Sequence, residues 1–180
     1  MDTIQLKDLT FKPYIGSAEI ATAVKNVAAR INEDLAGKNP LFLCVLNGAF
    51  VFAADLFREI TIPGAEIAFI RMKSYIGTQS TGEVQMVSGL TEDITGRTVV
   101  IVEDIVDTGH TLKQLKSILQ ECNPAEIKVA TLLFKPESLK CDVTIDYVAL
   151  DIPPAFIVGY GLDYDDLGRN LKDIYTIVQD

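Results

Sequence analysis

The feature that most constrains the fold is a short apolar run that ends in acidic residues and leads into a helical pattern. Residues 99–102 read Val-Val-Ile-Val, and the carboxylates of Glu103, Asp104 and Asp107 follow. Consecutive β-branched residues are typical of a strand that is buried on both faces, as in a parallel sheet. From residue 111 to 122, apolar residues recur at helical spacing, which predicts an amphipathic helix. The stretch therefore predicts a strand, a loop and a helix of an α/β domain.

Strand-like and helical patterns alternate along the rest of the chain. A stripe of apolar residues predicts a helix over residues 17–35, with Ser17 as its N-cap and Gly37 as its C-terminal stop. Because strand–helix–strand order implies parallel pairing, we predict one α/β domain over residues 1–180, a mostly parallel central sheet flanked by helices on both faces. The other expected elements are helices over 49–60 and 111–122, and strands over 41–46, 66–72, 98–103, 127–134, 145–150 and 155–158.

Composition argues against several classes of protein. The formal net charge of −9 disfavours broad binding to nucleic acid, which needs a basic surface. The N-terminus lacks a signal-peptide pattern, and the longest apolar run, residues 48–56, is too short to span a bilayer. A single histidine and the absence of a Cys-x-x-Cys pair argue against structural zinc. The odd number of cysteines, namely Cys44, Cys122 and Cys141, favours a reducing, cytoplasmic setting.

Residues 73–89 interrupt the alternation of strands and helices. They are rich in Ser, Thr, Gly and Gln and show little periodicity, which predicts a long loop or a loose hairpin. Such a stretch inside a compact domain is often a lid or a binding loop. The alternative is a solvated hairpin that has no functional role.

The loop that follows the acidic residues favours a phosphate group. Ligands of open α/β sheets bind beyond the carboxyl ends of the strands. Residues 107–111, Asp-Thr-Gly-His-Thr, place backbone N–H groups, two threonine hydroxyls and a helix N-terminus around one point. Glu103 and Asp104 would accept hydrogen bonds from sugar hydroxyls or hold water on Mg²⁺. In the alternative interpretation, Asp107 and Thr108 only cap the helix, and Glu103 and Asp104 are solvated.

Residues 103–111, Glu-Asp-Ile-Val-Asp-Thr-Gly-His-Thr, resemble the phosphoribosyl-pyrophosphate-binding signature of the type I phosphoribosyltransferases. The rest of the chain is similar to the hypoxanthine(-guanine) branch of that family. The resemblance implies purine salvage, in which the 5-phosphoribosyl group passes from phosphoribosyl pyrophosphate to N9 of hypoxanthine, guanine or xanthine, with Mg²⁺ as cofactor. It also implies a homodimer or homotetramer with no nucleic-acid or membrane partner, a lid over residues 73–89 and a base-binding hood over residues 151–180.

The resemblance further assigns roles to individual residues. Asp107 is the expected general base, which would take the N7 proton of the purine or stabilise positive charge that develops on the ring. Asn47 stands where many relatives carry lysine or arginine, so pyrophosphate binding there is expected to be weaker or entirely backbone-mediated. His110 would donate to the 5′-phosphate when protonated, or point to solvent. The implied contacts are Glu103, Asp104, Asp107, Thr108, Gly109, His110 and Thr111 for ribose and the 5′-phosphate; Asn47, Gly48, Ser74, Tyr75 and Arg169 for pyrophosphate; Lys135, Phe156, Ile157 and Asp163 for the base; and Glu103, Asp104 and Asp163 for the metal.

Three other functions fit parts of the sequence. A binding-only regulator of the same fold would sense nucleotides without catalysis, although the acidic charge counts against control of RNA or DNA. A phospho-acceptor receiver domain would carry its acidic pair near the N-terminus, whereas Glu103 and Asp104 lie past mid-chain. A dinucleotide-binding domain is disfavoured because Gly159-Tyr160-Gly161 is only a fragment of the glycine fingerprint, near the C-terminus.

Overall fold

The structure, a computed structural model, describes residues 2–74, 84–88 and 90–178, and it describes residues 73, 74 and 84–88 through their backbone only. The strands form two sheets, of which the larger has six strands in the order β5-β4-β3-β6-β7-β8. Neighbouring strands of this central sheet are parallel, except that β4 and β5 are antiparallel. The strands are β3 (Leu41–Leu46), β4 (Glu66–Ser74), β5 (Val84–Ser88), β6 (Thr98–Val106), β7 (Glu126–Phe134) and β8 (Tyr147–Asp151).

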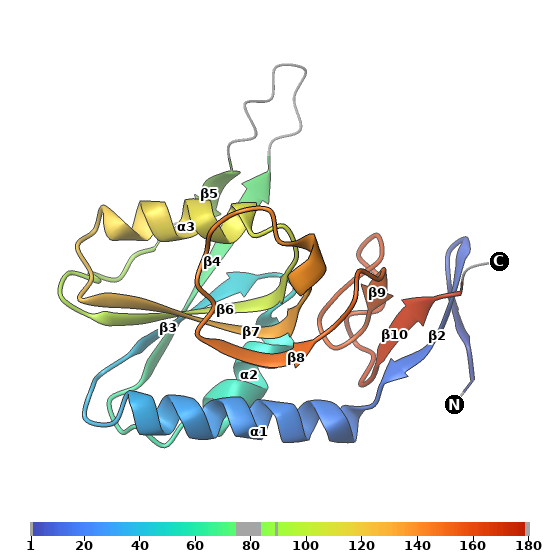
Figure 1. The fold of residues 1–180 in the computed structure, drawn as a ribbon, viewed down its shortest axis with the longest axis horizontal. Helices are drawn as coiled ribbons and strands as arrows, with labels where there is room; N and C mark the ends of the chain where they lie inside the picture. The colour runs from blue at the N-terminus through green and yellow to red at the C-terminus, as the bar shows by residue number, and fades with distance from the viewer. Residues whose placement is uncertain (1, 75–83, 89, 179–180) are drawn as a thin grey trace, which may run out of the picture.

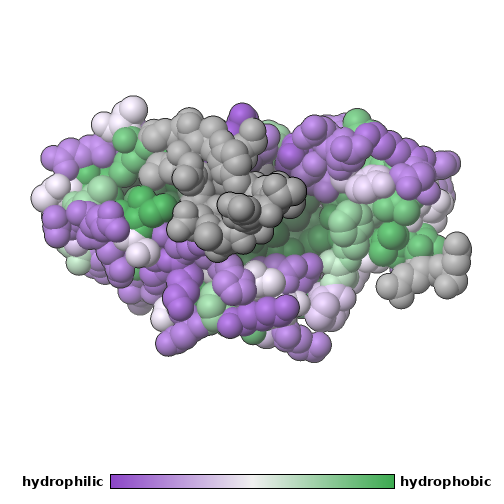
Figure 2. Space-filling view, turned by 90° about the horizontal axis from the view of Figure 1, so that it is seen from above, coloured by the Kyte–Doolittle hydropathy of each residue, from purple (hydrophilic) through white to green (hydrophobic). Residues whose placement is uncertain are grey.

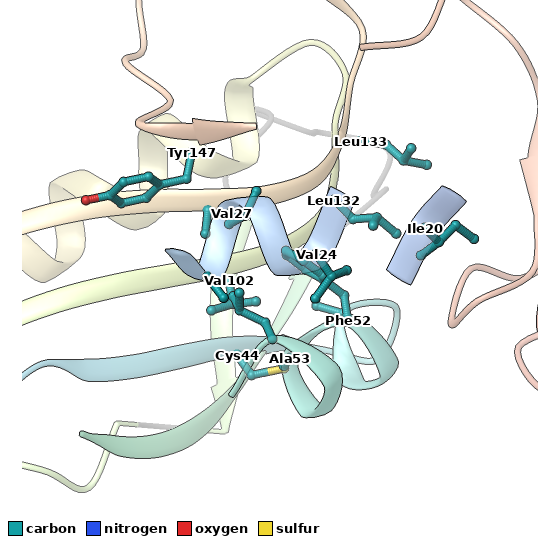
Figure 3. Close-up of a cluster of buried hydrophobic side chains, with 14 of the residues drawn as sticks. Ile20, Val24, Val27, Cys44, Phe52, Ala53, Val102, Leu132, Leu133 and Tyr147 are labelled. Carbon is teal, nitrogen blue, oxygen red and sulfur yellow. The ribbon is translucent and has the colours of Figure 1, made fainter. Parts of the chain in front are cut away.

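Helices cover both faces of the central sheet. The helices α1 (Ser17–Asp34) and α2 (Phe50–Arg58) lie on one face, and α3 (His110–Gln120) lies on the other (Figure 1). The larger buried cluster gathers Val24 of α1, Phe52 of α2 and Val102 of β6 (Figure 3). A second buried cluster includes Leu112 and Leu115 of α3. This arrangement confirms the predicted α/β fold with helices on both faces of a mostly parallel sheet.

The start of α1 differs from the prediction. The N-cap position is occupied by Gly16, which has no side chain, so the N-cap residue makes no side-chain hydrogen bond to the helix. Ser17, the predicted N-cap, is instead the first helical residue, and its N–H donates to the Asp173 carboxylate at 2.6 Å. A negative charge near a helix N-terminus is favourable, so this distant carboxylate does what a local cap would do. Gly37 follows the helix with φ of +77°, the left-handed conformation expected of a C-terminal stop.

A smaller sheet stands beside the central one and combines the two ends of the chain (Figure 1). The Tyr164 hydroxyl donates to the Asp8 carboxylate at 2.6 Å, which ties the turn between β1 and β2 to the C-terminal segment. The strand predicted over residues 155–158 is shorter than expected and belongs to this sheet. In the order β1-β2-β10-β9, its strands are β1 (Ile4–Leu6), β2 (Leu9–Ile15), β10 (Ile174–Ile177) and β9 (Ile157–Val158).

The strand that carries the acidic residues is longer than predicted. β6 continues beyond residue 103 to Val106, so Glu103 and Asp104 are strand residues. The reason is pairing, because β7 follows β6 in parallel register up to the pair of Val106 and Phe134. A short 3₁₀ turn, η1 (Pro136–Ser138), then follows β7.

The region predicted as a long loop or a loose hairpin has paired arms. β4 runs to Ser74 and pairs antiparallel with β5. Residues 75–83 and 89 lie outside the described residues. Over the part of the chain that is described, no helix has both the length and the apolar character needed to cross a membrane.

Cys44 offers a direct test of the buried core. Its side chain is fully buried in β3, and burial, with the charge of Glu103 as a lesser cause, raises the pKa of its thiol to about 12. At pH 8 the folded protein should therefore alkylate at Cys44 at least about 10³-fold more slowly than at the exposed Cys122. Mass spectrometry after timed iodoacetamide treatment measures both rates, and denaturant should equalise them. Equal rates in the folded protein would contradict this packing.

Candidate active site

A cavity of about 280 Å³ lies at the carboxyl edge of the central sheet. It is lined by the ends of β3, β4 and β6 and by the loop that leads into α3. Seen from above, the surface is hollowed between the part that carries α3 and the part that carries the smaller sheet (Figure 2). The cavity brings together most of the residues predicted to contact ribose and the 5′-phosphate, namely Glu103, Asp104, Asp107, Thr108, Gly109 and Thr111.

Two adjacent carboxylates form the floor of this cavity. Glu103 is only 7% exposed, so the interpretation of a solvated side chain is wrong for this residue. Burial, with the charge of Asp104 as a second cause, raises the pKa of Glu103 well above its usual value. Burial also raises the pKa of Asp104 to about 6, although its Oδ1 accepts the Ile105 N–H at 2.8 Å. Burying two neighbouring acids is costly, and such pairs concentrate at functional sites.

The 107–111 loop leaves the N-terminus of α3 open. Gly109 is the N-cap residue with φ of +81°, and no side-chain hydrogen bond caps the helix, so the interpretation of Asp107 and Thr108 as mere caps is wrong. A Cβ atom at Gly109 would lie 2.8 Å from Leu139 Cδ1 and 2.9 Å from Cys141 Sγ, and the positive φ adds backbone strain, so a side chain is disfavoured here. The first N–H groups of α3 therefore remain available to an anion.

The 107–111 loop is held in place by residues 140 and 141 and by a contact between two of its own side chains. The backbone N–H of Lys140 donates to the Thr108 carbonyl at 3.0 Å, and the Cys141 thiol donates to the same oxygen at 3.3 Å. His110 is exposed, and its Nδ1 lies 3.1 Å from Thr108 Oγ1. The imidazole thus contacts its own loop, and its predicted contact with a phosphate stays a prediction.

Asp107 and Lys135 are brought into contact by the register of two strands. Val106 and Phe134 are partners in the parallel pair of β6 and β7, so the next residue of each strand reaches the same edge. The Lys135 ammonium donates to Asp107 Oδ2 at 3.0 Å. The predicted base, which lines the cavity, and the predicted purine-binding lysine therefore form one ion pair.

The β3–α2 turn (residues 47–49) approaches the carboxylates closely. A Cβ atom at Gly48 would overlap with the Asp104 carboxylate, so a side chain at this position would displace that carboxylate. The Leu46–Asn47 peptide bond is cis. Arg71 of β4 donates to Asn47 Oδ1 at 2.7 Å. Sequence reasoning missed Arg71, because its place beside this turn follows from the pairing of Arg71 with Leu46 in β4 and β3, a register that the sequence alone does not reveal.

The C-terminal segment meets the same turn. A Cβ atom at Gly161 would overlap with the Gly48 carbonyl oxygen. The Arg169 guanidinium donates to the Gly161 carbonyl at 2.9 Å and lies 2.8 Å from Asp163 Oδ1. Asp163 Oδ2 also accepts the Asp166 N–H at 2.8 Å. Asp163 and Arg169 are thus built into the turn that faces the cavity, and neither is a freely solvated surface charge.

Two of the predicted base-contacting residues lie at the edge of the smaller sheet, where Ile157 begins β9 and Phe156 directly precedes it. Phe156 is 46% exposed, with its ring centroid 6.0 Å from that of Phe11 and 5.8 Å from that of Tyr164. Ile157 of β9 is buried. These two residues do not line the 280 Å³ cavity, whereas Lys135, the predicted contact of the 6-oxo group, is in contact with Asp107 of the cavity lining.

The predicted pyrophosphate contacts include Ser74 and Tyr75, and the predicted metal ligands lie in the cavity and the C-terminal segment. Ser74 ends β4 and is described by its backbone only, and Tyr75 lies outside the described residues. Over residues 2–74, 84–88 and 90–178, no three His, Cys, Asp or Glu side chains cluster as metal ligands. The neighbouring carboxylates of Glu103 and Asp104 remain the pair best suited to a hard cation that shares its coordination with substrate.

Comparison with known proteins defines the class. The family described as "Phosphoribosyl transferase domain" matches residues 16–165, and the chain therefore belongs to the phosphoribosyltransferase family. It is 44% identical, over 170 residues and 94% of each chain, to a hypoxanthine-guanine phosphoribosyltransferase of Streptococcus thermophilus. A solved hypoxanthine phosphoribosyltransferase of Staphylococcus aureus is 38% identical, with a TM-score of 0.88, over 93% of this chain and 91% of that chain. A mutant hypoxanthine phosphoribosyltransferase of Trypanosoma cruzi, solved as a ternary substrates complex, is 39% identical, with a TM-score of 0.87, over 93% of this chain and 95% of that chain.

Proposed function

We propose that the chain is a purine-salvage phosphoribosyltransferase that transfers the 5-phosphoribosyl group of phosphoribosyl pyrophosphate to N9 of hypoxanthine. The products are IMP and pyrophosphate. The observation that carries the proposal is the 3.0 Å contact between Asp107 and Lys135. It joins a loop suited to phosphate with a lysine suited to a 6-oxo group, and the names of the relatives support the same reaction.

The two residues of this contact have complementary roles in the reaction. The bond between C1′ and the pyrophosphate oxygen breaks, and the bond between C1′ and purine N9 forms. The Asp107 carboxylate accepts the N7 proton as positive charge develops on the ring. The Lys135 ammonium donates to the 6-oxo group, and it rejects adenine because the 6-amino group of adenine is itself a donor.

Mg²⁺ fits the carboxylates at the cavity floor. Mg²⁺ in phosphate-binding enzymes is held by one or two carboxylates together with substrate oxygens, so it needs no larger cluster of side chains. Glu103 and Asp104 line the cavity together with the 107–111 loop, and the charge of Asp163 is close enough to contribute to the raised pKa of Asp104. When bound, the ion would neutralise charge on the departing pyrophosphate. Arg169, held by Asp163 and the Gly161 carbonyl, adds a positive charge that favours the ionised form of Asp104.

A single assay separates this proposal from a binding-only regulator. The purified chain is mixed with phosphoribosyl pyrophosphate, hypoxanthine and Mg²⁺, and released pyrophosphate is measured with each component omitted in turn. An enzyme releases pyrophosphate over many turnovers and only in the complete mixture. Binding of the substrates without such release would favour the regulator.

Replacing Lys135 with alanine should weaken the use of hypoxanthine selectively. Hydrogen bonds to charged groups contribute about 1.5–3 kcal/mol, so KM for hypoxanthine should rise about 10- to 100-fold. The affinity for phosphoribosyl pyrophosphate should change little, because the lysine lies at the base end. Lys140→Ala is the matched control, since the side chain of Lys140 is exposed and its contact with Thr108 is made by the backbone. Equal losses for both substrates would show that Lys135 does not select the base.

The proposal extends to the cellular compartment and the oligomeric state of the protein. All three cysteines are free in the structure, which agrees with a reducing, cytoplasmic compartment. We further propose a single domain over residues 1–180 that assembles as a homodimer or homotetramer. Analytical ultracentrifugation distinguishes these assemblies from a monomer.

A further inference from the structure

Arg71 is a basic side chain beside the proposed site, and the proposed reaction does not account for it. It lies on β4 opposite Leu46 of β3, so it stands next to the β3–α2 turn. Its guanidinium donates to Asn47 Oδ1 at 2.7 Å. A guanidinium has donors only, so the oxygen of the Asn47 amide must face Arg71. The two N–H donors of that amide are thereby turned away from the arginine, where they are free to meet an acceptor.

The charges around the cavity explain why this contact matters. The cavity is lined by Glu103, Asp104 and Asp107, and a substrate with several phosphate groups brings further negative charge. Lys135 lies 3.0 Å from Asp107, and Arg169 lies 2.8 Å from Asp163, so each of these cations contacts a carboxylate. The hydrogen-bond partner of Arg71 is a neutral amide, and among the described residues no carboxylate forms an ion pair with this guanidinium.

The turn that Arg71 contacts is shared with the other guanidinium of the site. Gly161 packs against the Gly48 carbonyl, and Arg169 donates to the Gly161 carbonyl at 2.9 Å. Guanidinium groups thus reach this turn from two elements, from β4 through Asn47 and from the C-terminal segment through Gly161. The turn carries no charged side chain of its own, and of these two guanidinium groups only that of Arg71 has no carboxylate partner among the residues that the structure describes.

We propose that Arg71 is a positioning residue for the pyrophosphate group of the substrate. It orients the Asn47 amide so that its N–H donors face the anion, and it adds the positive charge that Asn47 itself lacks. This inference rests on the proposed function. It requires that Arg71 strengthens the binding of phosphoribosyl pyrophosphate and of pyrophosphate, and that it leaves the binding of IMP, which has no pyrophosphate, almost unchanged.

Calorimetric titration of the three ligands in the presence of Mg²⁺ tests the inference. Arg71→Gln should weaken binding of phosphoribosyl pyrophosphate and of pyrophosphate about 10- to 100-fold, and binding of IMP by less than about twofold. Arg71→Lys should retain part of the affinity, because the charge remains while the planar guanidinium is lost. Arg58→Gln, which removes an exposed arginine at the far end of α2, should leave all three affinities unchanged.

A rescue variant distinguishes charge at this turn from a structural effect. Introducing Asn47→Lys into the Arg71→Gln protein moves the cation from the strand to the turn, and it should recover most of the lost affinity for pyrophosphate. Equal losses for pyrophosphate and IMP, an unchanged affinity in Arg71→Gln, or a failed rescue would each overturn the inference. A wild-type protein that neither binds phosphoribosyl pyrophosphate nor releases pyrophosphate would contradict the proposed function itself.

Discussion

Replacing Asp107 with asparagine is expected to lower turnover by roughly 10²- to 10⁴-fold, the usual contribution of a general base. Asparagine has the same shape but cannot accept a proton at neutral pH. The binding of phosphoribosyl pyrophosphate should stay close to that of the wild type, because the 107–111 loop offers mainly backbone N–H groups and Gly109 keeps its conformation. Steady-state kinetics with hypoxanthine gives the turnover, and calorimetry gives the dissociation constant.

The matched control for Asp107→Asn is Glu137→Gln. Glu137 is an exposed carboxylate in η1, just beyond Lys135, so this variant removes the same charge from the neighbourhood without touching the ion pair. Its turnover should remain near that of the wild type. Near-normal turnover in Asp107→Asn would remove Asp107 as the base, and an equal loss in Glu137→Gln would indicate a general electrostatic effect.

Replacing Asp104 with asparagine should stabilise the metal-free protein while weakening substrate binding. Burial, the main cause, raises the pKa of Asp104 from 3.8 to about 6, so the ionised carboxylate destabilises the folded state. At pH 8 the substitution should raise the free energy of unfolding by about 1–3 kcal/mol, since one pKa unit corresponds to about 1.4 kcal/mol. In the presence of Mg²⁺, the same variant should bind phosphoribosyl pyrophosphate more weakly, a trade of function for stability.

The pH dependence fixes the sign of this effect. Below pH 3.8 the carboxyl of Asp104 is protonated in both the folded and the unfolded state, and it contributes nothing. Between pH 3.8 and about 6 the unfolded state ionises first, so the wild type loses stability relative to Asp104→Asn, and the difference is constant above that range. Denaturant unfolding in EDTA at pH 4 and pH 8 measures this difference in the free energy of unfolding between the two proteins. Asp142→Asn, at an exposed carboxylate, should change stability by less than about 0.5 kcal/mol. A less stable Asp104→Asn protein at pH 8 would contradict the account of a strained carboxylate pair.

The central sheet could be predicted from the sequence because its strands are buried on both faces. The runs over residues 41–46 and 98–103 have no alternation, and the structure places both in the middle of the sheet. The helix over residues 17–35 was equally clear, since Val24 and Val27 fall on one buried face. Patterns of this kind depend only on local spacing and burial.

The smaller sheet was harder to predict because its strands depend on distant partners. β10 pairs with β2 from the other end of the chain, and β9 has only two residues. β2 does alternate, with Phe11 and Ile15 buried, but this short pattern is interrupted by Pro13. The cap on Ser17 from Asp173 has the same cause, because no local pattern reveals a partner so far along the chain.

The candidate site divides in the same way. The residues of the 103–111 stretch lie together because they are neighbours in sequence, and their cavity was predictable from that stretch. The ion pair between Asp107 and Lys135 depends on the register of two strands, and the contact between Arg71 and Asn47 depends on the register of two others. The register between two strands cannot be predicted from their positions in the sequence. These two contacts could therefore be found only in the structure.

The measurement that tests the central claim most directly is nucleotide formation from hypoxanthine and from adenine. Each base is incubated with phosphoribosyl pyrophosphate, Mg²⁺ and the purified chain, and the nucleotide product is quantified by chromatography. The pairing of Asp107 with Lys135 predicts steady formation of IMP and very little AMP. Formation of no nucleotide, or preferred use of adenine, would contradict the assignment of this site to 6-oxopurine salvage.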